Sequence, residues 1–431
     1  MKRLWRRGLS LALAGSCALG AATQIAAGAP RSAAAPGGAS APVTIEFWNY
    51  WDGNNAKAIS DLISRFNRTH PNIRVKNVTF PWGNLFEKMQ VARAGGDLPP
   101  VAAGDIAWMA NLNRSGALVD ITATVRRNVN TNDFYPELLR YGRYRGKIQA
   151  LPVSTNNLAL FYNKDLFQRA GLNPNRPPQT WEQVREYAKR IAALGGGVQG
   201  FEIFTQPGEG LTWQFQPYLW QAGAEYLVPP KYDRPGFNNP RGRRALTYLV
   251  NLIQTDKVAE AGQWGAFDKG LAGMRVDGSW MVSIYADQAP FQFGTSMIPT
   301  CAGCKRATNM GGEQVFVFKS TSAKQKAATT FAIWLASTKT QIDWDVATAF
   351  MPVRKSVAGS RRIQGLLSRD NRYRAFIRQQ KYAHARPPIP QYPATSEAFS
   401  REIEKAFHGT VSVSQALVNA DRAVRAALRG R

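Results

Sequence analysis

The sequence predicts an α/β protein with two domains. Apolar and polar residues alternate over 43–47 as in a half-buried strand, apolar residues recur at helical spacing over 59–66, and a second alternating stretch follows at 73–78. This strand–helix–strand order builds a mostly parallel sheet with helices on its faces. Roughly 390 residues follow the N-terminal segment, which is too many for one hydrophobic core.

Further segments continue the pattern. The sequence predicts strands at 148–152 and 158–162, a helix that begins with a capping box at 180–183, and a helix over 240–254. The last third of the chain has mostly helical spacing. Ligands of such sheets bind beyond the carboxyl ends of the strands, so we expect the aromatic segment at 48–52 to lie near a ligand.

Residues 1–42 have the composition of an export signal and a linker. Four basic side chains between residues 2 and 7 precede an uncharged stretch over 8–30, which is rich in Ala and Gly rather than Leu and therefore favours cleavage over anchoring. Cys17 lies in an imperfect lipoprotein box and is a candidate for lipid attachment. Residues 31–42 are rich in Ala, Pro, Gly and Ser, as in a disordered linker. The sequence therefore predicts an exported protein of the periplasm or another extracytoplasmic space.

The chain is strongly basic, with 55 Lys and Arg against 29 Asp and Glu and a net charge of +26. The basic residues are scattered and form no run or stripe interleaved with aromatic residues, so we expect no nucleic-acid partner. Contact with an anionic cell envelope, or origin in an arginine-rich proteome, accounts for the positive charge better than nucleic-acid binding does. We expect a monomer.

A series of motifs resembles the family 1 extracellular solute-binding proteins of ABC transporters, which include maltose-, oligosaccharide- and glycerol-3-phosphate-binding proteins. The resemblance covers essentially the whole chain after the N-terminal segment, in the expected order. The motifs lie at residues 95–101, 151–157, 160–167, 170–172, 177–181, 277–280, 311–312, 331–335 and 351–354.

The resemblance implies a two-lobed periplasmic-binding-protein-like fold of type II, with a hinge and a ligand cleft between the lobes. It places 43–152 plus 292–340 in the N-terminal lobe and 156–288 plus 345–431 in the C-terminal lobe. It implies the substrate-binding component of an ABC importer, which closes on its ligand and delivers it to permease subunits in the membrane. The sequence shows no Ser/His/Asp grouping, metal-ligand spacing or phosphate-binding Gly loop, so we expect no enzymatic activity and no cofactor.

A sugar offers an apolar ring face and a rim of hydroxyls, so its site needs aromatic side chains together with carboxylates and amides. Such residues stand near the ends of predicted strands and in loops, and Asp277, Gly312 and Arg354 join them because they lie in the family-like motifs. Trp is usually buried, so we expect about half of the tryptophans in the core. The candidate ligand-binding residues are Trp48, Tyr50, Trp51, Asp52, Trp82, Asp105, Asn156, Asn157, Glu209, Trp213, Trp264, Asp277, Ser279, Trp280, Gly312 and Arg354.

The predicted ligand is a neutral di- or oligosaccharide, because carboxylates among the candidates would repel a phosphate. Glycerol-3-phosphate or another phosphorylated polyol is the alternative. An exported glycoside hydrolase is the alternative of another class, since its catalytic carboxylates need no local motif.

Cys301 and Cys304 form the one cysteine pair with close spacing. No metal-ligand spacing accompanies them, so the sequence predicts no metal site. In an oxidising compartment we expect the two residues to form a disulfide.

Overall fold

The computed structural model describes residues 41–262 and 264–430. The predicted export signal and the candidate lipid site Cys17 lie outside the described residues, as does nearly all of the predicted linker. The chain from Pro42 onward forms one compact unit. Within the described ranges, no helix is both long and apolar enough to cross a membrane.

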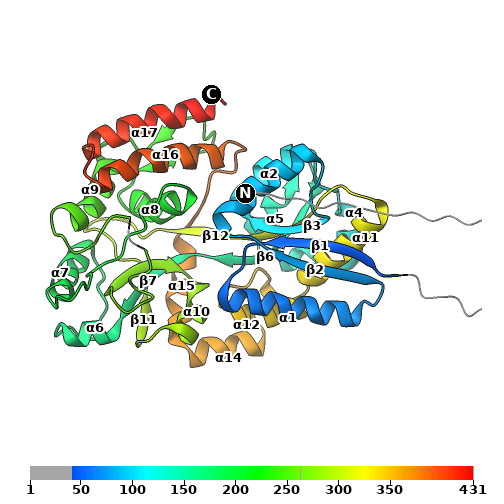
Figure 1. Ribbon diagram of the computed structural model, residues 1–431, viewed down its shortest axis with the longest axis horizontal. Coiled ribbons are helices and arrows are strands. Elements are labelled where there is room, and N and C mark those ends of the chain that lie inside the picture. The colour runs from blue at the N-terminus through cyan, green and yellow to red at the C-terminus, as the bar shows by residue number, and fades with distance from the viewer. Residues whose placement is uncertain (1–40, 263, 431) are drawn as a thin grey trace, which may run out of the picture. The chain divides into compact units, whose positions relative to one another are not determined.

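The larger sheet has six strands, and the order β13-β12-β3-β1-β2 describes five of them, with β6 paired to β12. Figure 1 shows helices around this sheet. β1 runs parallel to β2 and β3, as predicted, but β12 is antiparallel to both β3 and β6. β12 runs parallel to β13, so the sheet is mixed, and the prediction of parallel pairing fails only where β12 meets β3 and β6. The strands are β1 (Val43–Asn49), β2 (Ile73–Thr79), β3 (Val101–Asp105), β6 (Ala150–Asn156), β12 (Thr308–Val317) and β13 (Ala383–Ala385).

A second sheet of three strands is antiparallel throughout. β7 (Leu158–Asn163) is its central strand, between β10 (Met274–Gly278) and β11 (Phe293–Ser296). The residue ranges of the two lobes stay a prediction. Because β11 pairs with β7, we propose that the chain returns to the N-terminal lobe after Ser296 rather than at residue 292. Two short hairpins complete the strands: β4 (Arg143–Tyr144) with β5 (Lys147–Ile148), and β8 (Glu225–Leu227) with β9 (Pro235–Gly236).

Apolar residues at helical spacing pack α1 (Gly53–Thr69) onto the larger sheet. Ile59, Leu62 and Phe66 of this helix are buried, and the Phe66 ring lies 5.0 Å from that of Phe331. Phe331 in turn lies 5.1 Å from Phe47 of β1. The other helices beside this sheet include α2 (Trp82–Gly95), α3 (Met109–Arg114), α4 (Thr122–Asn128), α5 (Pro136–Tyr141), α11 (Ser322–Leu335) and α12 (Thr338–Thr348).

Side-chain caps begin several helices where the sequence predicts them. Thr180 accepts a hydrogen bond from the backbone of Gln183 at 3.2 Å, and α7 (Trp181–Ala192) follows. Asn239 caps α9 (Pro240–Gln254), whose bounds agree with the prediction. The remaining helices are α6 (Lys164–Arg169), α8 (Glu209–Gln221), α10 (Met281–Gln288), α13 (Lys355–Ala358), α14 (Arg361–Arg369), α15 (Arg374–Gln379), α16 (Tyr392–Phe407) and α17 (Val413–Leu428).

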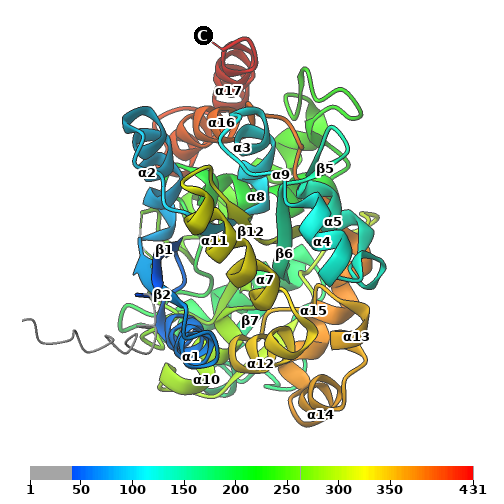
Figure 2. The same ribbon diagram turned by 90° about the vertical axis from the view of Figure 1, so that its right-hand side faces the viewer.

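Two neighbouring strands connect the two sheets. β6 and β12 pair through residues 150–156 and 311–316 and run side by side in Figure 2. Only Asn157 separates β6, in the larger sheet, from β7, in the smaller one. The side chains at this crossing are therefore fixed by backbone that belongs to both sheets.

Candidate functional site

A cavity of about 280 Å³ lies where β1, β3 and β6 end, as the strand topology predicts for a ligand site. Tyr50, Asp105 and Asn156 come from these three strand ends. α8 and β10 supply its other wall. Its lining residues are Tyr50, Trp51, Asp52, Asn55, Trp82, Asp105, Asn156, Phe204, Gly210, Trp213, Gln214, Trp264, Arg275, Asp277, Trp280, Met281, Glu313, Phe350 and Arg386. We call it the sugar cavity below, after the ligand that the sequence predicts.

Arg386 is an ion-paired cation in the wall of the sugar cavity. Its guanidinium is only 2% exposed and donates to Asp105 Oδ2 at 3.1 Å and to Glu209 Oε1 at 2.7 Å. It lies over the Trp213 ring, 4.3 Å from the centroid. Burial raises the pKa of Glu209, and the neighbouring Arg386 opposes that rise. Arg386 thus fixes Trp213 and Asp105 in place, with its own charge already neutralised.

Arg275 forms a second ion-paired cluster in the opposite wall. It donates to Asp277 Oδ2 at 2.8 Å, to Glu202 Oε2 at 3.1 Å and to Asp268 Oδ1 at 3.1 Å. The guanidinium lies 3.8 Å from the centroid of the Trp264 ring. Three carboxyl groups therefore surround one cation, and the cluster presents Trp264 and Asp277 to the cavity.

Glu313 is a buried acid at the base of the cavity, 5% exposed. The Tyr50 hydroxyl donates to its Oε1 at 2.9 Å, and the Ser154 hydroxyl lies against its other oxygen. Burial and the nearby charge of Asp105 raise the pKa of Glu313 to about 8. Glu313 is therefore protonated at neutral pH and adds no negative charge to the cavity.

Two glycines let aromatic side chains reach the sugar cavity. A Cβ on Gly278 would lie 2.0 Å from the ring of Trp280, so this position leaves room for the indole to fold back over β10. A Cβ on Gly311 would lie 2.1 Å from Asn156 Oδ1 and 2.9 Å from Trp213. The close approach of β12 to these two side chains thus requires glycine.

The structure brings ten of the sixteen candidate residues together in the sugar cavity. Trp51 is 3% exposed and Trp82 37% exposed, so the set runs from core to surface. The ten are Tyr50, Trp51, Asp52, Trp82, Asp105, Asn156, Trp213, Trp264, Asp277 and Trp280.

Six candidates lie outside this cavity, so we leave them out of the proposed site. Trp48 lies on the same strand face as Glu46, and its indole donates to the Glu46 carboxylate at 3.0 Å. Asn157 faces away from Asn156 and donates to Gln380 Oε1 at 2.8 Å. Arg354 is 4% exposed and donates to Asp133 at 3.1 Å. The other three lie close behind the lining: Glu209 beside Arg386, Ser279 beneath Trp280, and Gly312 against the backbone of Ser154.

Sequence reasoning missed both arginines and Glu313. Arg386 pairs with Asp105 across 281 positions, and no local pattern reports such a contact. A signal did exist for Arg275, because it alternates with Asp277 in an otherwise apolar strand and the two side chains share a face.

A disulfide joins Cys301 and Cys304 in the loop between β11 and β12, with their Cα atoms 5.2 Å apart. Cys301 is buried, and Cys304 is partly exposed. The pair lies apart from the sugar cavity, whose lining includes neither residue. Its state in the exported protein stays a prediction.

Comparisons with known proteins agree with this architecture. Residues 51–342 match the family of bacterial extracellular solute-binding proteins. The chain is similar to the solved cyclic alpha-maltosyl-1,6-maltose binding protein from Arthrobacter globiformis, with 36% identity, a TM-score of 0.75 and coverage of 90% of this chain and 100% of that one. It is similar to T. maritima MalE3, with 23% identity, a TM-score of 0.81 and coverage of 89% and 99%.

Among curated proteins, the sn-glycerol-3-phosphate-binding periplasmic protein UgpB of Escherichia coli is 23% identical over 401 residues, which cover 87% of this chain and 90% of UgpB. The structural neighbours confirm the predicted two-lobed α/β fold. The chain belongs to the bacterial extracellular solute-binding proteins.

Proposed function

We propose that this protein is the substrate-binding component of an ABC importer and that it captures a neutral di- or oligosaccharide in the sugar cavity. The observation that carries the proposal is the pairing of aromatic walls with hydrogen-bonding groups. Trp82, Trp213 and Trp280 supply flat apolar surfaces for sugar rings, and Asn156 and Asp277 supply acceptors for hydroxyls.

The charges of the cavity favour a neutral ligand over a phosphorylated one. Among the described residues that line it, both basic side chains already have carboxylate partners: Arg386 has two and Arg275 has three. A phosphate would have to displace these partners, whereas a sugar hydroxyl donates to them. The net charge of the whole chain therefore says little about the ligand.

The relatives support a carbohydrate and also name the alternative. The Arthrobacter globiformis protein, at 36% identity, binds cyclic alpha-maltosyl-1,6-maltose. UgpB of Escherichia coli, at 23% identity, is a glycerol-3-phosphate-binding protein. Glycerol-3-phosphate or another phosphorylated polyol is the second candidate for this chain, and a phosphate held by Arg275 or Arg386 would be its signature.

We propose a binding role without catalysis. The family is made up of substrate-binding proteins. A glycoside hydrolase needs one carboxyl as acid and another as base or nucleophile. Of the four carboxyl groups that line the sugar cavity, Asp105 and Asp277 are held by arginine and Glu313 lies against the hydroxyls of Tyr50 and Ser154, which leaves Asp52. Incubation with maltose and cyclic alpha-maltosyl-1,6-maltose should leave both sugars intact on chromatography, and released glucose would indicate a hydrolase.

Export and a monomeric state are part of the same proposal. We infer that the export signal within residues 1–42 sends the protein to the periplasm or another extracytoplasmic space, with Cys17 as a candidate lipid anchor, and that the mature protein acts as a monomer. Mass spectrometry of protein recovered from the envelope tests cleavage of the signal and lipidation of Cys17, because the two give different masses for the first peptide.

Calorimetry with two ligand classes tests the proposed ligand. Maltose or cyclic alpha-maltosyl-1,6-maltose should bind, and sn-glycerol-3-phosphate should not. Trp280→Ala removes a partly exposed ring of the cavity and should weaken sugar binding by about 1–3 kcal/mol. Trp334→Ala, in α11, is the matched control, because Trp334 packs on Phe331 outside the cavity and its loss should leave affinity unchanged. Tight binding of glycerol-3-phosphate alone would overturn the proposal.

A further inference from the structure

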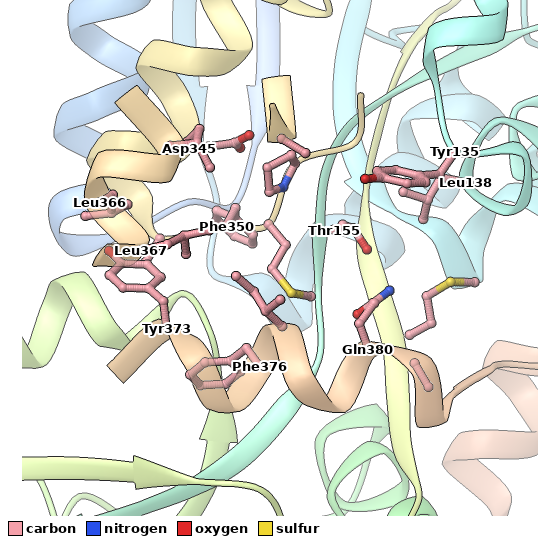
Figure 3. Close-up of a pocket in the computed structure, with 18 of the residues that line it drawn as sticks. Tyr135, Leu138, Thr155, Asp345, Phe350, Leu366, Leu367, Tyr373, Phe376 and Gln380 are labelled. Carbon is pink, nitrogen blue, oxygen red and sulfur yellow. The ribbon is translucent and has the colours of Figure 1, made fainter. Parts of the chain in front are cut away.

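A second cavity of about 510 Å³ lies where Thr155 of β6 and Met310 of β12 approach the helices after residue 340. Figure 3 shows its lining, with Tyr135 and Leu138 on one side and residues of α12, α14 and α15 on the other. It shares only Phe350 with the lining of the sugar cavity. We call it the hinge cavity, because β6 and β12 are the strands that connect the two sheets.

The walls of the hinge cavity are mainly apolar and aromatic. Phe350, Tyr373 and Phe376 contribute rings, and Ile363 and Leu366 contribute aliphatic surface. Phe376 is 1% exposed and Tyr373 8% exposed, so this part of the lining is fixed by core packing. Tyr135, at 37% exposure, and Ile377, at 42%, are lining residues that reach solvent.

Asp345 is a buried acidic side chain in this mainly apolar lining. Its side chain extends from α12 toward the side of the cavity where Thr155 and Tyr135 lie (Figure 3). Asp345 is 0% exposed, and among the described residues neither of its carboxyl oxygens has a hydrogen-bond partner. A buried polar group without a partner destabilises the fold, so this carboxyl is a position where a ligand that donates hydrogen bonds would gain most.

The ionisable side chains of the hinge cavity select for a cation. The chain carries 55 Lys and Arg against 29 Asp and Glu, yet the described residues that line this cavity include Asp345 and Glu137 and no Lys, Arg or His. Glu137 is exposed and lies in α5 beside Tyr135. An anionic ligand would meet two acids here and no base.

We propose that the hinge cavity binds a primary alkylammonium, with its ammonium group on the Asp345 carboxyl and its alkyl chain against Phe350, Tyr373 and Phe376. A primary ammonium has three N–H donors and so can satisfy both free oxygens, which a quaternary ammonium cannot do. The rings also attract a cation through their faces. This site is independent of the proposed sugar binding.

Binding should release a proton. Burial raises the pKa of Asp345 well above its ordinary value, which favours the protonated carboxyl while the cavity lacks a cation. When the ammonium binds, the Asp345 proton passes to solvent and the carboxylate pairs with the cation. The other ionisable groups of the lining are Glu137, Tyr135 and Tyr373, and burial raises the pKa of Tyr373 above its ordinary value.

Calorimetry with n-hexylammonium and hexan-1-ol tests the proposal, because the two probes share their chain length and differ in charge. Hexylammonium should bind the wild type at least tenfold more tightly than hexanol. Titrations in buffers of different ionisation enthalpy should show about one proton released per hexylammonium bound at pH 7. Asp345→Asn should lower hexylammonium affinity at least tenfold and leave hexanol binding unchanged.

Asp343→Asn is the matched control on the same helix, since Asp343 pairs with Arg65 and Arg362 and does not line the cavity. It should bind hexylammonium like the wild type. Equal affinity of Asp345→Asn and the wild type for hexylammonium would overturn the proposal. Should Asp345→Asn fail to fold, the wild type decides alone: equal affinity for the two probes, or no proton release, contradicts the site.

Discussion

Glu313 shows how burial sets the chemistry of single residues in the sugar cavity. With a pKa of about 8 in the folded chain and an ordinary value of 4.5 when unfolded, it binds its proton more tightly in the folded state. Its contribution to stability is thus fully present below pH 4.5 and is lost as pH rises through 8. Glu313→Gln keeps the partners Tyr50 and Ser154 but cannot ionise.

Urea unfolding of the wild type and Glu313→Gln from pH 4.5 to 8.5 tests this prediction. The free energy of unfolding of the variant should increase relative to that of the wild type as pH rises, by at most about 1.4 kcal/mol per pH unit. The difference should level off above pH 8. Stability curves that stay parallel over this range would show that Glu313 titrates normally in the folded protein.

The Cys301–Cys304 pair gives a second prediction for individual residues. In non-reduced protein purified from the envelope, maleimide should label neither cysteine, and two further labels per chain should be gained after reduction. Tryptic mass spectrometry assigns the labels to residues. Full labelling of both thiols without reductant would contradict the disulfide.

At the scale of residues, the sequence predicts site residues whose positions are given by strand alternation. It misses site residues whose roles depend on partners distant in the sequence. Tyr50 and Asn156 were predicted because they stand at the ends of strands that the pattern defines. Arg386 follows β13, a strand of only three residues, and its role depends on Asp105 and Glu209, which are far away in the sequence. Only the folded chain brings these groups together.

At the scale of elements, strand β12 is central to the proposed function. It pairs with β3, β6 and β13, and it carries Glu313 into the base of the sugar cavity. Its Gly311 lies against Asn156 and Trp213, where a Cβ would approach to within 2.1 Å and 2.9 Å. The strand can occupy this position only while residue 311 lacks a side chain.

Gly311→Ala should therefore lower sugar affinity at least tenfold, because Asn156 and Trp213 must move. Calorimetry measures the loss, and thermal unfolding shows that the variant still folds. Gly83→Ala is the control: it lies beside Trp82, but a Cβ there meets nothing within 4 Å, so its affinity should stay close to that of the wild type. Unchanged affinity in Gly311→Ala would show that this contact does not shape the site.

Local patterns predict helices and parallel strands well, and they fail where a strand returns from elsewhere. The bounds of α9 agree with its predicted range because a side-chain cap and Pro240 define its start. β12 has no counterpart among the predicted strands, and nothing within residues 308–317 shows that a strand there would run antiparallel to β3. Sheet order depends on contacts that are remote in the sequence.

For the whole molecule, two cavities lie on either side of the strands that connect the sheets. The sugar cavity draws its lining from the ends of β1, β3 and β6 and from α8 and β10, so a ligand held by both groups favours the conformation in which they are close. Closure of the lobes on the ligand is therefore the expected response to binding.

Small-angle scattering of the mature protein tests the central claim most directly, because it reports binding, closure and ligand class in one observable. A saturating neutral oligosaccharide, such as cyclic alpha-maltosyl-1,6-maltose, should reduce the radius of gyration, and sn-glycerol-3-phosphate should leave it unchanged. A smaller radius with glycerol-3-phosphate alone would contradict the proposed ligand. An unchanged radius with an oligosaccharide that calorimetry shows to be bound would contradict closure of the lobes around a sugar.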